Sequence, residues 1–250
     1  MAMTEAGAAL TEAHGVAQLG VVGRLIRLFE AEWSVGVAFD PVAFTAWVNE
    51  MAPEVAAAYA LSAQTAERYY AAFLVAENVP GPLVRAPVPT PDPSRFVENL
   101  DRFGPAYARS LLEKGLTDDE AVKRALVQMS LSATRDVSAG GRDSIAAHLD
   151  ADEAALGWQR VPRANCCAFC AMLAARGPVY SSRGAAGGGR HWHRGCKCRP
   201  EPVFDRRTSL PSEAARYAEL WDETNPADLN EFRRVLERPH LHRGGEPSDA

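Results

Sequence analysis

Apolar side chains recur at intervals of three and four residues over residues 15–33, which is the spacing of one face of an α-helix. The intervening positions are mostly small, polar or charged, so the pattern predicts an amphipathic helix with a single buried face. The apolar stripe consists of Val22, Leu25, Ile26, Phe29 and Trp33.

A second, longer helix is expected over residues 53–77, which are rich in alanine. Before it, Asp40 followed by Pro41 is typical of an N-cap and a first helical turn. Tyr69 is expected at the edge of the apolar stripe, and the tyrosines are interpreted as packing residues. The stripe itself consists of Val55, Tyr59, Ala63, Ala66, Tyr70 and Phe73.

The pattern then changes, because six prolines occur between Pro80 and Pro93. Proline lacks a backbone donor and favours extended conformations, so this stretch predicts a stiff connector or an arm lying on another surface. It is the expected hinge of the N-terminal part.

Helical signals resume at Ser94, and a break or kink is expected at residues 104–105, where glycine precedes proline. Thr117 and Glu120 have the spacing of a capping box at the start of the next helix. The glycine pair at 140–141 is expected to end or kink that helix.

Three shorter helices complete the helical pattern. The first covers residues 145–155, the second covers 211–221, and residues 225–226 are expected to cap the third. The third helix carries apolar residues at helical spacing, namely Leu229, Phe232, Val235 and Leu236.

All five cysteines lie between residues 166 and 198, in a chain without a recognisable secretory signal. Odd numbers of clustered cysteines are not typical of a disulfide framework, and in a reducing cytoplasm they more often bind metal. Cys167 and Cys170 form a C-x-x-C pair, and His193, Cys196 and Cys198 form a second cluster. Two short-spaced clusters separated by a loop are typical of a tetrahedral zinc site.

Five candidate ligands compete for four places, and the spacing leaves open whether three cysteines with the histidine or four cysteines bind. Cys196 and Cys198 can both bind only if the chain bends between them. Cys166 is expected to point away from the ion as a small buried residue, and His191 is expected outside the ligand set.

The zinc is expected to be structural, since cysteines can fill the coordination sphere and no H-E motif lies nearby. No nucleophile motif, phosphate-binding loop or pair of carboxylates in a suitable context is present, so the chain is not expected to be an enzyme. Short strands are expected at residues 158–161, 178–180 and 199–204, with a helix at 168–176 packing on them through Met172 and Leu173.

These patterns together predict a mainly α protein with a small α+β module stapled by zinc. The predicted organisation is a helical N-terminal region (1–79), a proline-rich linker (80–93), a second helical region (94–157), the zinc module (158–204), C-terminal helices (205–238) and a disordered tail (239–250).

The charge is unevenly distributed, which raises a second functional class. The net charge of the chain is −5, yet residues 160–207 contain ten Lys or Arg and two acidic residues. This local excess of +8, with Trp192 between two histidines, is compatible with nucleic-acid binding. The alternative is therefore a zinc-dependent nucleic-acid-binding module or a nuclease using His191 or His193 as its base.

The cysteine region also resembles a known family. The motifs W-x-R-V-P from Trp158, C-x-F-C-x-M-L-A-x-R-G-P-V-Y from Cys167, and H-x-x-C-x-C followed by P-V-F are similar to the MuF-like minor capsid (head morphogenesis) proteins of tailed phages, especially those of actinobacteria. The family's metal pattern corresponds to Cys167, Cys170, His193, Cys196 and Cys198. Cys166 and the glycine-rich loop before His191 are departures from it.

The resemblance implies a virion protein in the capsid interior or at the portal vertex, assembled in the host cytoplasm. The implied partners are the portal protein or other capsid components, with packaged DNA as a further contact. No membrane partner is expected, because no run approaches the roughly 18 apolar residues of a membrane span. A general scaffold or adaptor with no phage role would fit the helices and the zinc staple equally well.

Overall fold

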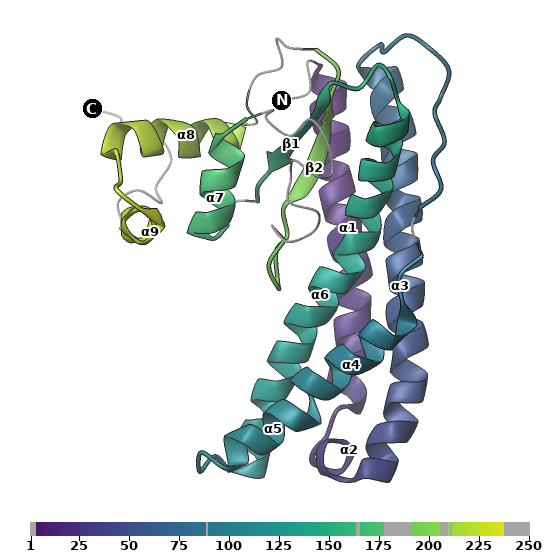
Figure 1. The fold of residues 1–250 in the computed structure, drawn as a ribbon, viewed down its shortest axis with the longest axis vertical. Helices are drawn as coiled ribbons and strands as arrows, with labels where there is room; N and C mark the ends of the chain where they lie inside the picture. The colour runs from purple at the N-terminus through teal and green to yellow at the C-terminus, as the bar shows by residue number, and fades with distance from the viewer. Residues whose placement is uncertain are drawn as a thin grey trace, which may run out of the picture.

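The computed structural model describes residues 4–88, 90–163, 166–177, 192–205, 210 and 212–237. Helices α1 (Glu5–Glu32), α3 (Pro41–Ala76) and α6 (Asp118–Ala151) run side by side as a long bundle, with a two-stranded sheet against one end (Figure 1). The prediction of a mainly α protein with a small α+β module is confirmed.

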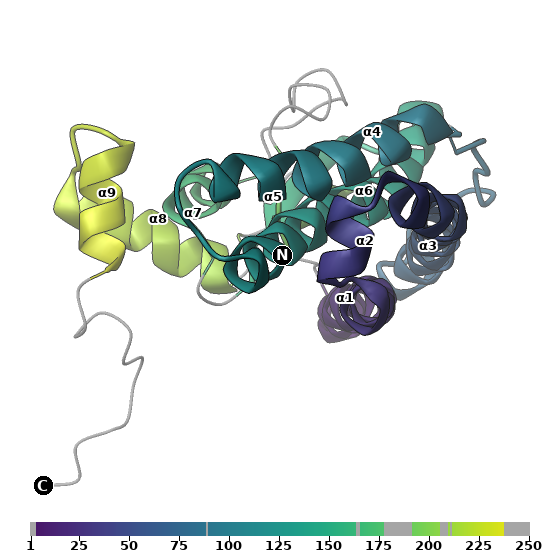
Figure 2. The same cartoon turned by 90° about the horizontal axis from the view of Figure 1, so that it is seen from below.

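The bundle is closed at its other end by short helices. Helix α2 (Val35–Phe39) joins α1 to α3, and α4 (Pro93–Phe103) and α5 (Pro105–Leu112) pack against α6 (Figure 2). The predicted break between α4 and α5 is confirmed, because Gly104 separates them and Pro105 begins the second.

Local capping explains where the long helices begin. The side chain of Asp40 accepts hydrogen bonds from the N–H groups of Val42 and Ala43, with Pro41 in the first turn of α3. Thr117 and Glu120 form the predicted capping box of α6. Each cap satisfies backbone donors that have no partner inside the helix.

The apolar faces of these helices share one core. One hydrogen bond within this core joins two of the helices: the indole N–H of Trp33, at the end of α1, donates to the Val122 carbonyl oxygen of α6 at 3.0 Å. The predicted stripe of α1 is buried, with Ile26 partly exposed. The core residues of lowest exposure include Phe29, Ala38, Val55, Ala108, Ala121, Ala125, Met129 and Val137.

The connector from α3 to α4 has no helix or strand in its described residues and runs back alongside the bundle (Figure 1). Val88 packs against the shared core, so part of the connector lies on the surface of the bundle.

Several helices are longer than predicted, and α1 begins at Glu5 rather than near residue 15. The expected start at residue 53 is wrong, since Pro53 lies inside α3. An internal proline costs a helix about 3 kcal/mol, but Met51 and Val55 on either side are buried, and their packing offsets that cost.

The glycine pair at 140–141 neither ends nor interrupts α6, which continues to Ala151, so the separate helix predicted at 145–155 belongs to it. A Cβ at Gly140 would lie 2.2 Å from the Tyr59 carbonyl oxygen of α3. The Gly141 N–H donates to the Ser62 hydroxyl oxygen at 2.9 Å. The glycines therefore allow close approach of two helices.

The tyrosines of α3 are packing residues, as predicted, but Tyr69 is buried rather than at an edge. Its ring stacks on His14, and its hydroxyl shares a 2.8 Å hydrogen bond with Thr11. The Tyr70 hydroxyl donates to Asp152 at 2.8 Å, so both phenols have partners inside the bundle.

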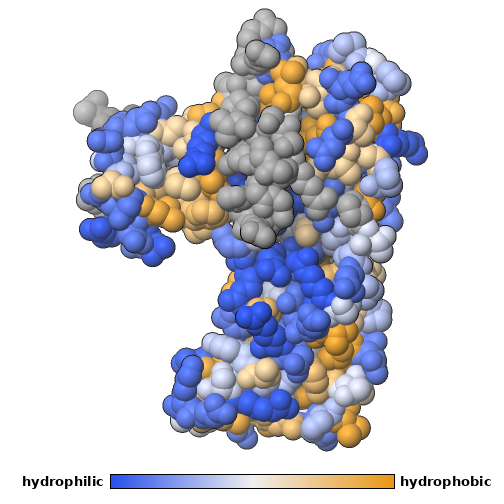
Figure 3. Space-filling model, in the orientation of Figure 1, coloured by the Kyte–Doolittle hydropathy of each residue, from blue (hydrophilic) through white to orange (hydrophobic). Residues whose placement is uncertain are grey.

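The C-terminal part projects sideways from the upper end of the bundle. Strands β1 (Gly157–Val161) and β2 (Arg199–Val203) pair antiparallel, confirming two of the predicted strands. Beyond them, α7 (Ala168–Ala175), α8 (Ser212–Thr224) and α9 (Leu229–Leu236) form a projection, and the bundle surface beneath it is largely hydrophilic (Figure 3).

The projection has its own apolar cluster. Its packing differs from the prediction that Met172 packs on the strands, and the last helix is not capped at residues 225–226 as predicted. Met172 packs with Tyr217 and Phe232, because α8 and α9 cover that side of α7. Asn225, with φ of 42°, follows the end of α8, and the N-cap of α9 is Asp228, whose side chain accepts from Glu231 N–H.

The predicted strand at 178–180, His191 and the tail at 239–250 lie outside the described residues. Among the helices that are described, none combines the length and apolar character that crossing a membrane requires.

We expect Gly140→Ala to lower the free energy of unfolding by about 1 to 3 kcal/mol, because the added methyl group overlaps the α3 backbone. The matched control is Gly20→Ala in α1, where an added Cβ meets nothing within 4 Å. It should raise stability by about 0.5 to 1 kcal/mol. Urea unfolding followed by circular dichroism measures both, and equal effects would contradict the close-approach interpretation.

Candidate metal centre

The first pair of candidate ligands lies where the chain enters α7. Cys167 is the N-cap residue, with extended backbone angles, and Cys170 lies in the first turn. This turn-into-helix geometry places both sulfurs on the same side of the chain, as the C-x-x-C spacing predicts. Cys170 is buried, whereas Cys167 is exposed.

The second cluster is a turn that precedes β2. The Cys196 N–H donates to the His193 carbonyl oxygen at 3.1 Å, and Gly195 takes a φ of 73° that side chains rarely adopt. Cys198 directly precedes the first residue of β2. The turn allows His193, Cys196 and Cys198 to face α7.

The two clusters converge. His193 Nε2 lies 3.0 Å from Cys167 Sγ and 3.3 Å from Cys170 Sγ, and the sulfurs of Cys170 and Cys196 are 3.5 Å apart. Two trios could hold a metal ion, Cys167–Cys170–His193 and Cys170–Cys196–Cys198, each with its ligand atoms within 4.8 Å of one another. For comparison, sulfurs about 2.3 Å from a tetrahedral ion are about 3.8 Å apart. All five predicted ligands therefore lie in one cluster, with Cys170 common to both trios.

The histidine is oriented for coordination through one nitrogen. Its Nδ1 lies 2.8 Å from the Arg194 carbonyl oxygen, which only accepts, so Nδ1 carries the proton. Nε2 is then the ring nitrogen that faces the sulfurs and could bind an ion. A hydrogen bond at the second ring nitrogen is the usual support of a metal-binding histidine.

The thiols have unequal acidities. A hydrogen bond from the Cys170 thiol, supported by the Cys170 N–H and by His193, lowers the pKa of Cys167 to about 5, although burial opposes this. Hydrogen bonds from Cys166, Cys170 and Cys196 hold the pKa of Cys198 well below its usual range. The same network raises the pKa of Cys170 through its hydrogen bonds to Cys167 and Cys196, and the pKa of Cys196 is also raised, so Cys167 and Cys198 are the cysteines most available as thiolates, the form that binds metal.

Cys166 does not point away from the cluster as expected. It is half-buried, and its pKa is raised chiefly by a hydrogen bond to Cys198 and by burial. It also contacts the Tyr217 hydroxyl of α8. Cys166 is absent from both trios, so its place is beside a candidate ligand.

Two arginines and Trp192 lie beside the cluster, and sequence reasoning did not place the arginines there. The guanidinium carbons of Arg142 and Arg160 lie 4.0 and 3.7 Å from the centre of the Trp192 ring, which also stacks on Trp158. Arg160 Nη1 lies 4.0 Å from Cys196 Sγ. Arg142 belongs to α6, far from the cysteines in sequence, and no motif marks it.

The bundle and the cysteine–histidine cluster together define a mainly helical protein with a candidate metal module. The chain belongs to the VG15 protein family, whose model matches residues 5–224. It is also 31% identical over 162 residues to the Gene 15 protein of Mycobacterium phage D29. That match covers 50% of this chain and 54% of the relative, so the chain spans about half the length of the curated protein it matches. No solved structure matches the chain. The family and the relative support a phage-encoded protein.

We expect Cys170→Ser to abolish stoichiometric metal binding, because Cys170 is common to both trios. The matched control is Cys166→Ser, which lies in the same cluster outside the trios and should keep its metal. Elemental analysis of the purified variants measures metal per chain. Retention of bound metal by Cys170→Ser would contradict this ligand arrangement.

Proposed function

We propose that this protein is a structural minor capsid component of a phage, acting in head morphogenesis at or near the portal in the manner of MuF-like proteins. The observation that carries the proposal is the convergence of the cysteine–histidine motifs into one cluster in a chain of a phage protein family. All five residues of the cluster lie in the motifs that resemble the MuF-like family.

Zinc is the proposed metal. Thiolate and imidazole ligands suit zinc, which introduces no redox chemistry into a structural site. Five protein donors are available for four places, so the protein alone can complete the coordination sphere. Zinc would then supply folding free energy to this region, on the order of 10 kcal/mol in small zinc modules.

The role is proposed to be structural rather than enzymatic. A catalytic zinc usually keeps one position open for water or substrate. Here Cys170, Cys196 and Cys198 are buried, and surplus protein donors compete for any open position. The nuclease alternative likewise needs an open metal position, and its candidate base His193 is exposed but has its Nε2 beside the sulfurs of Cys167 and Cys170.

The proposed partners are the portal protein or other capsid components, and the proposed location is the capsid interior or the portal vertex. Packaged DNA is a further candidate contact, but burial reduces the exposed part of the basic segment. Arg160 and Arg199 are buried, and Arg199 pairs with Glu12. Since guanidinium groups cover the Trp192 ring, it is poorly placed to stack on a base.

We expect this chain to be present in purified virions and to co-purify with the portal protein when the two are expressed together. Mass spectrometry of virions and affinity purification of a tagged portal measure these outcomes. Absence from virions would contradict the proposal. DNA retardation in a gel at about 50 mM salt, lost at higher salt, would favour the nucleic-acid-binding alternative.

We also expect elemental analysis to find zinc bound to the purified chain, and a strong chelator to lower its thermal unfolding midpoint. The reason is that an ion bound only by the folded state adds to its stability. The Cys170→Ser variant is the control, since it should be insensitive to the chelator. A wild-type midpoint unchanged by chelator, in protein without stoichiometric metal, would contradict the zinc proposal.

A further inference from the structure

The Cys196-Lys197-Cys198 segment must bend for both cysteines to reach one ion. In an extended chain, side chains two residues apart lie about 6.6 Å from each other. The sulfurs of Cys196 and Cys198 instead lie within 4.8 Å of each other and of Cys170 Sγ. Some interaction therefore has to hold the backbone of this segment in its bent form.

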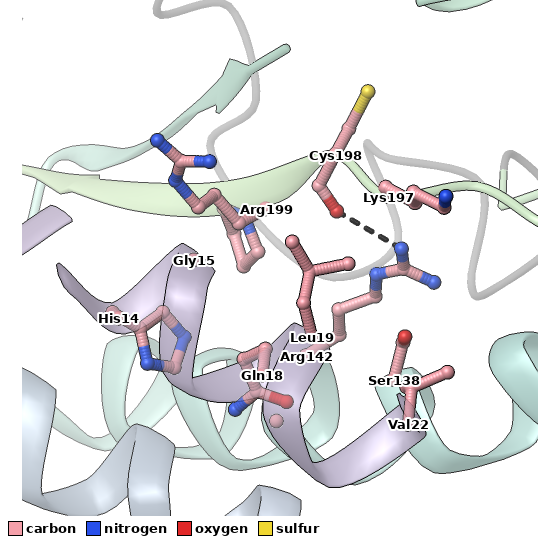
Figure 4. A pocket seen from close by; sticks show the side chains of 12 residues that line it. His14, Gly15, Gln18, Leu19, Val22, Ser138, Arg142, Lys197, Cys198 and Arg199 are labelled. Atoms are coloured by element: carbon pink, nitrogen blue, oxygen red, sulfur yellow. Dashed lines mark hydrogen bonds between the residues drawn. The ribbon is translucent and has the colours of Figure 1, made fainter. Parts of the chain in front are cut away.

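Arg142 of α6 makes that interaction. Its Nη2 donates to the Cys196 carbonyl oxygen at 2.8 Å and to the Cys198 carbonyl oxygen at 2.9 Å. Two carbonyl groups from positions two residues apart thus meet at a single nitrogen. Figure 4 shows the Cys198 carbonyl directed toward Arg142 and its sulfur directed away from it. Because Arg142 binds the carbonyl oxygens on one side of the segment, the Cys198 sulfur faces the opposite side, toward Cys170.

Arg142 is itself held in place. Its side chain is buried between α6 and the turn, and the guanidinium lies over the Trp192 ring, 4.0 Å from its centre. A planar guanidinium fixed by a ring and two carbonyl groups has little freedom to move. Lysine at this position would keep the charge but lose the planar stacking.

The same helix anchors the turn at two further points. The Gly195 N–H donates to the Leu131 carbonyl oxygen at 3.1 Å, and Arg194 Nη1 donates to Gln128 Oε1 at 3.0 Å. The turn that carries His193, Cys196 and Cys198 is therefore attached to α6 at several positions along its length.

We propose that Arg142 is a positioning residue for the metal centre, which holds the C-x-C turn so that Cys196 and Cys198 both face the ion. This inference rests on the proposed metal site. Arg142 acts through the backbone of two ligands and does not touch the ion. Loss of a hydrogen-bonding partner behind a ligand typically weakens metal binding about 10- to 100-fold.

The test compares Arg142→Met, which keeps the aliphatic stem and removes the donors, with Arg142→Lys and the wild type. Arg124→Met is the matched control, because Arg124 is an exposed arginine on the same helix. Zinc affinity is measured by chelator competition, and the cobalt-loaded proteins are compared by absorption. The intensity of the sulfur-to-cobalt charge-transfer band reports how many thiolates bind.

We expect Arg142→Met to bind zinc about 10- to 100-fold more weakly and to show a weaker charge-transfer band. Arg142→Lys should recover part of both, because its ammonium still donates to carbonyl groups, and Arg124→Met should match the wild type. Wild-type affinity and spectrum in Arg142→Met would overturn the proposal. If that variant loses its helical circular dichroism signal, Arg142→Lys decides: several-fold weaker binding supports the proposal, and wild-type behaviour overturns it.

The two proposals fail in different ways. A wild-type chain that binds no metal removes the zinc site itself. A wild-type chain that binds zinc, with Arg142 variants that bind it equally well, leaves the zinc site intact and removes only the positioning role.

Discussion

Helix α6 packs against α1 and α3 and also binds the cysteine turn, so the positions of the bundle and of the candidate metal centre depend on this one helix. On one side, its glycine pair brings it against α3, where the Gly141 N–H reaches the Ser62 hydroxyl. That hydroxyl in turn donates to Gln18 of α1 at 2.6 Å, so one small polar network joins the three long helices. Toward the sheet, Arg142 is bonded to the cysteine turn. Because Gly141 and Arg142 are consecutive, the close helix contact and the cysteine turn are fixed at one level of the bundle.

Burying the charge of Arg142 has a cost that its surroundings must offset. Removing a charged group from water costs several kcal/mol unless it is paired or fully hydrogen-bonded. Burial lowers the pKa of Arg142, while the neighbouring sulfurs of Cys196 and Cys198 act in the opposite direction. The carbonyl oxygens, the Trp192 ring and the sulfurs provide part of the negative potential that a buried guanidinium requires, while its Nη1 has no hydrogen-bond partner among the described residues. The buried charge of Arg142, a residue of the bundle, is therefore stabilised by polar groups of the cysteine turn.

Much of the fold could be predicted because its signals are local. Asp40, Thr117 and the apolar spacing of α1 identify helix starts and buried faces from a few neighbouring residues. The cysteine spacing likewise indicated which side chains would meet. The errors came where distant packing decided the outcome. Pro53 is tolerated because its neighbours are buried, and the glycines of α6 serve the backbone of another helix. Arg142 lies outside every local pattern, since its partners are carbonyl groups more than 50 residues away.

The position of Arg142 also restricts how five donors can share four places. If both Cys196 and Cys198 are held toward the ion, the buried trio with Cys170 occupies three places, and one place remains for Cys167 or His193. His193 can bind through Nε2 while its Nδ1 keeps the hydrogen bond to the Arg194 carbonyl oxygen. Cys167 can bind because its lowered pKa makes the thiolate available. With zinc, the two sets differ by one unit of charge, and the additional charge of Cys167 would lie on the exposed side, where water screens it. The fourth ligand is therefore either Cys167 or His193, which are both exposed, while the buried trio is the same in both sets.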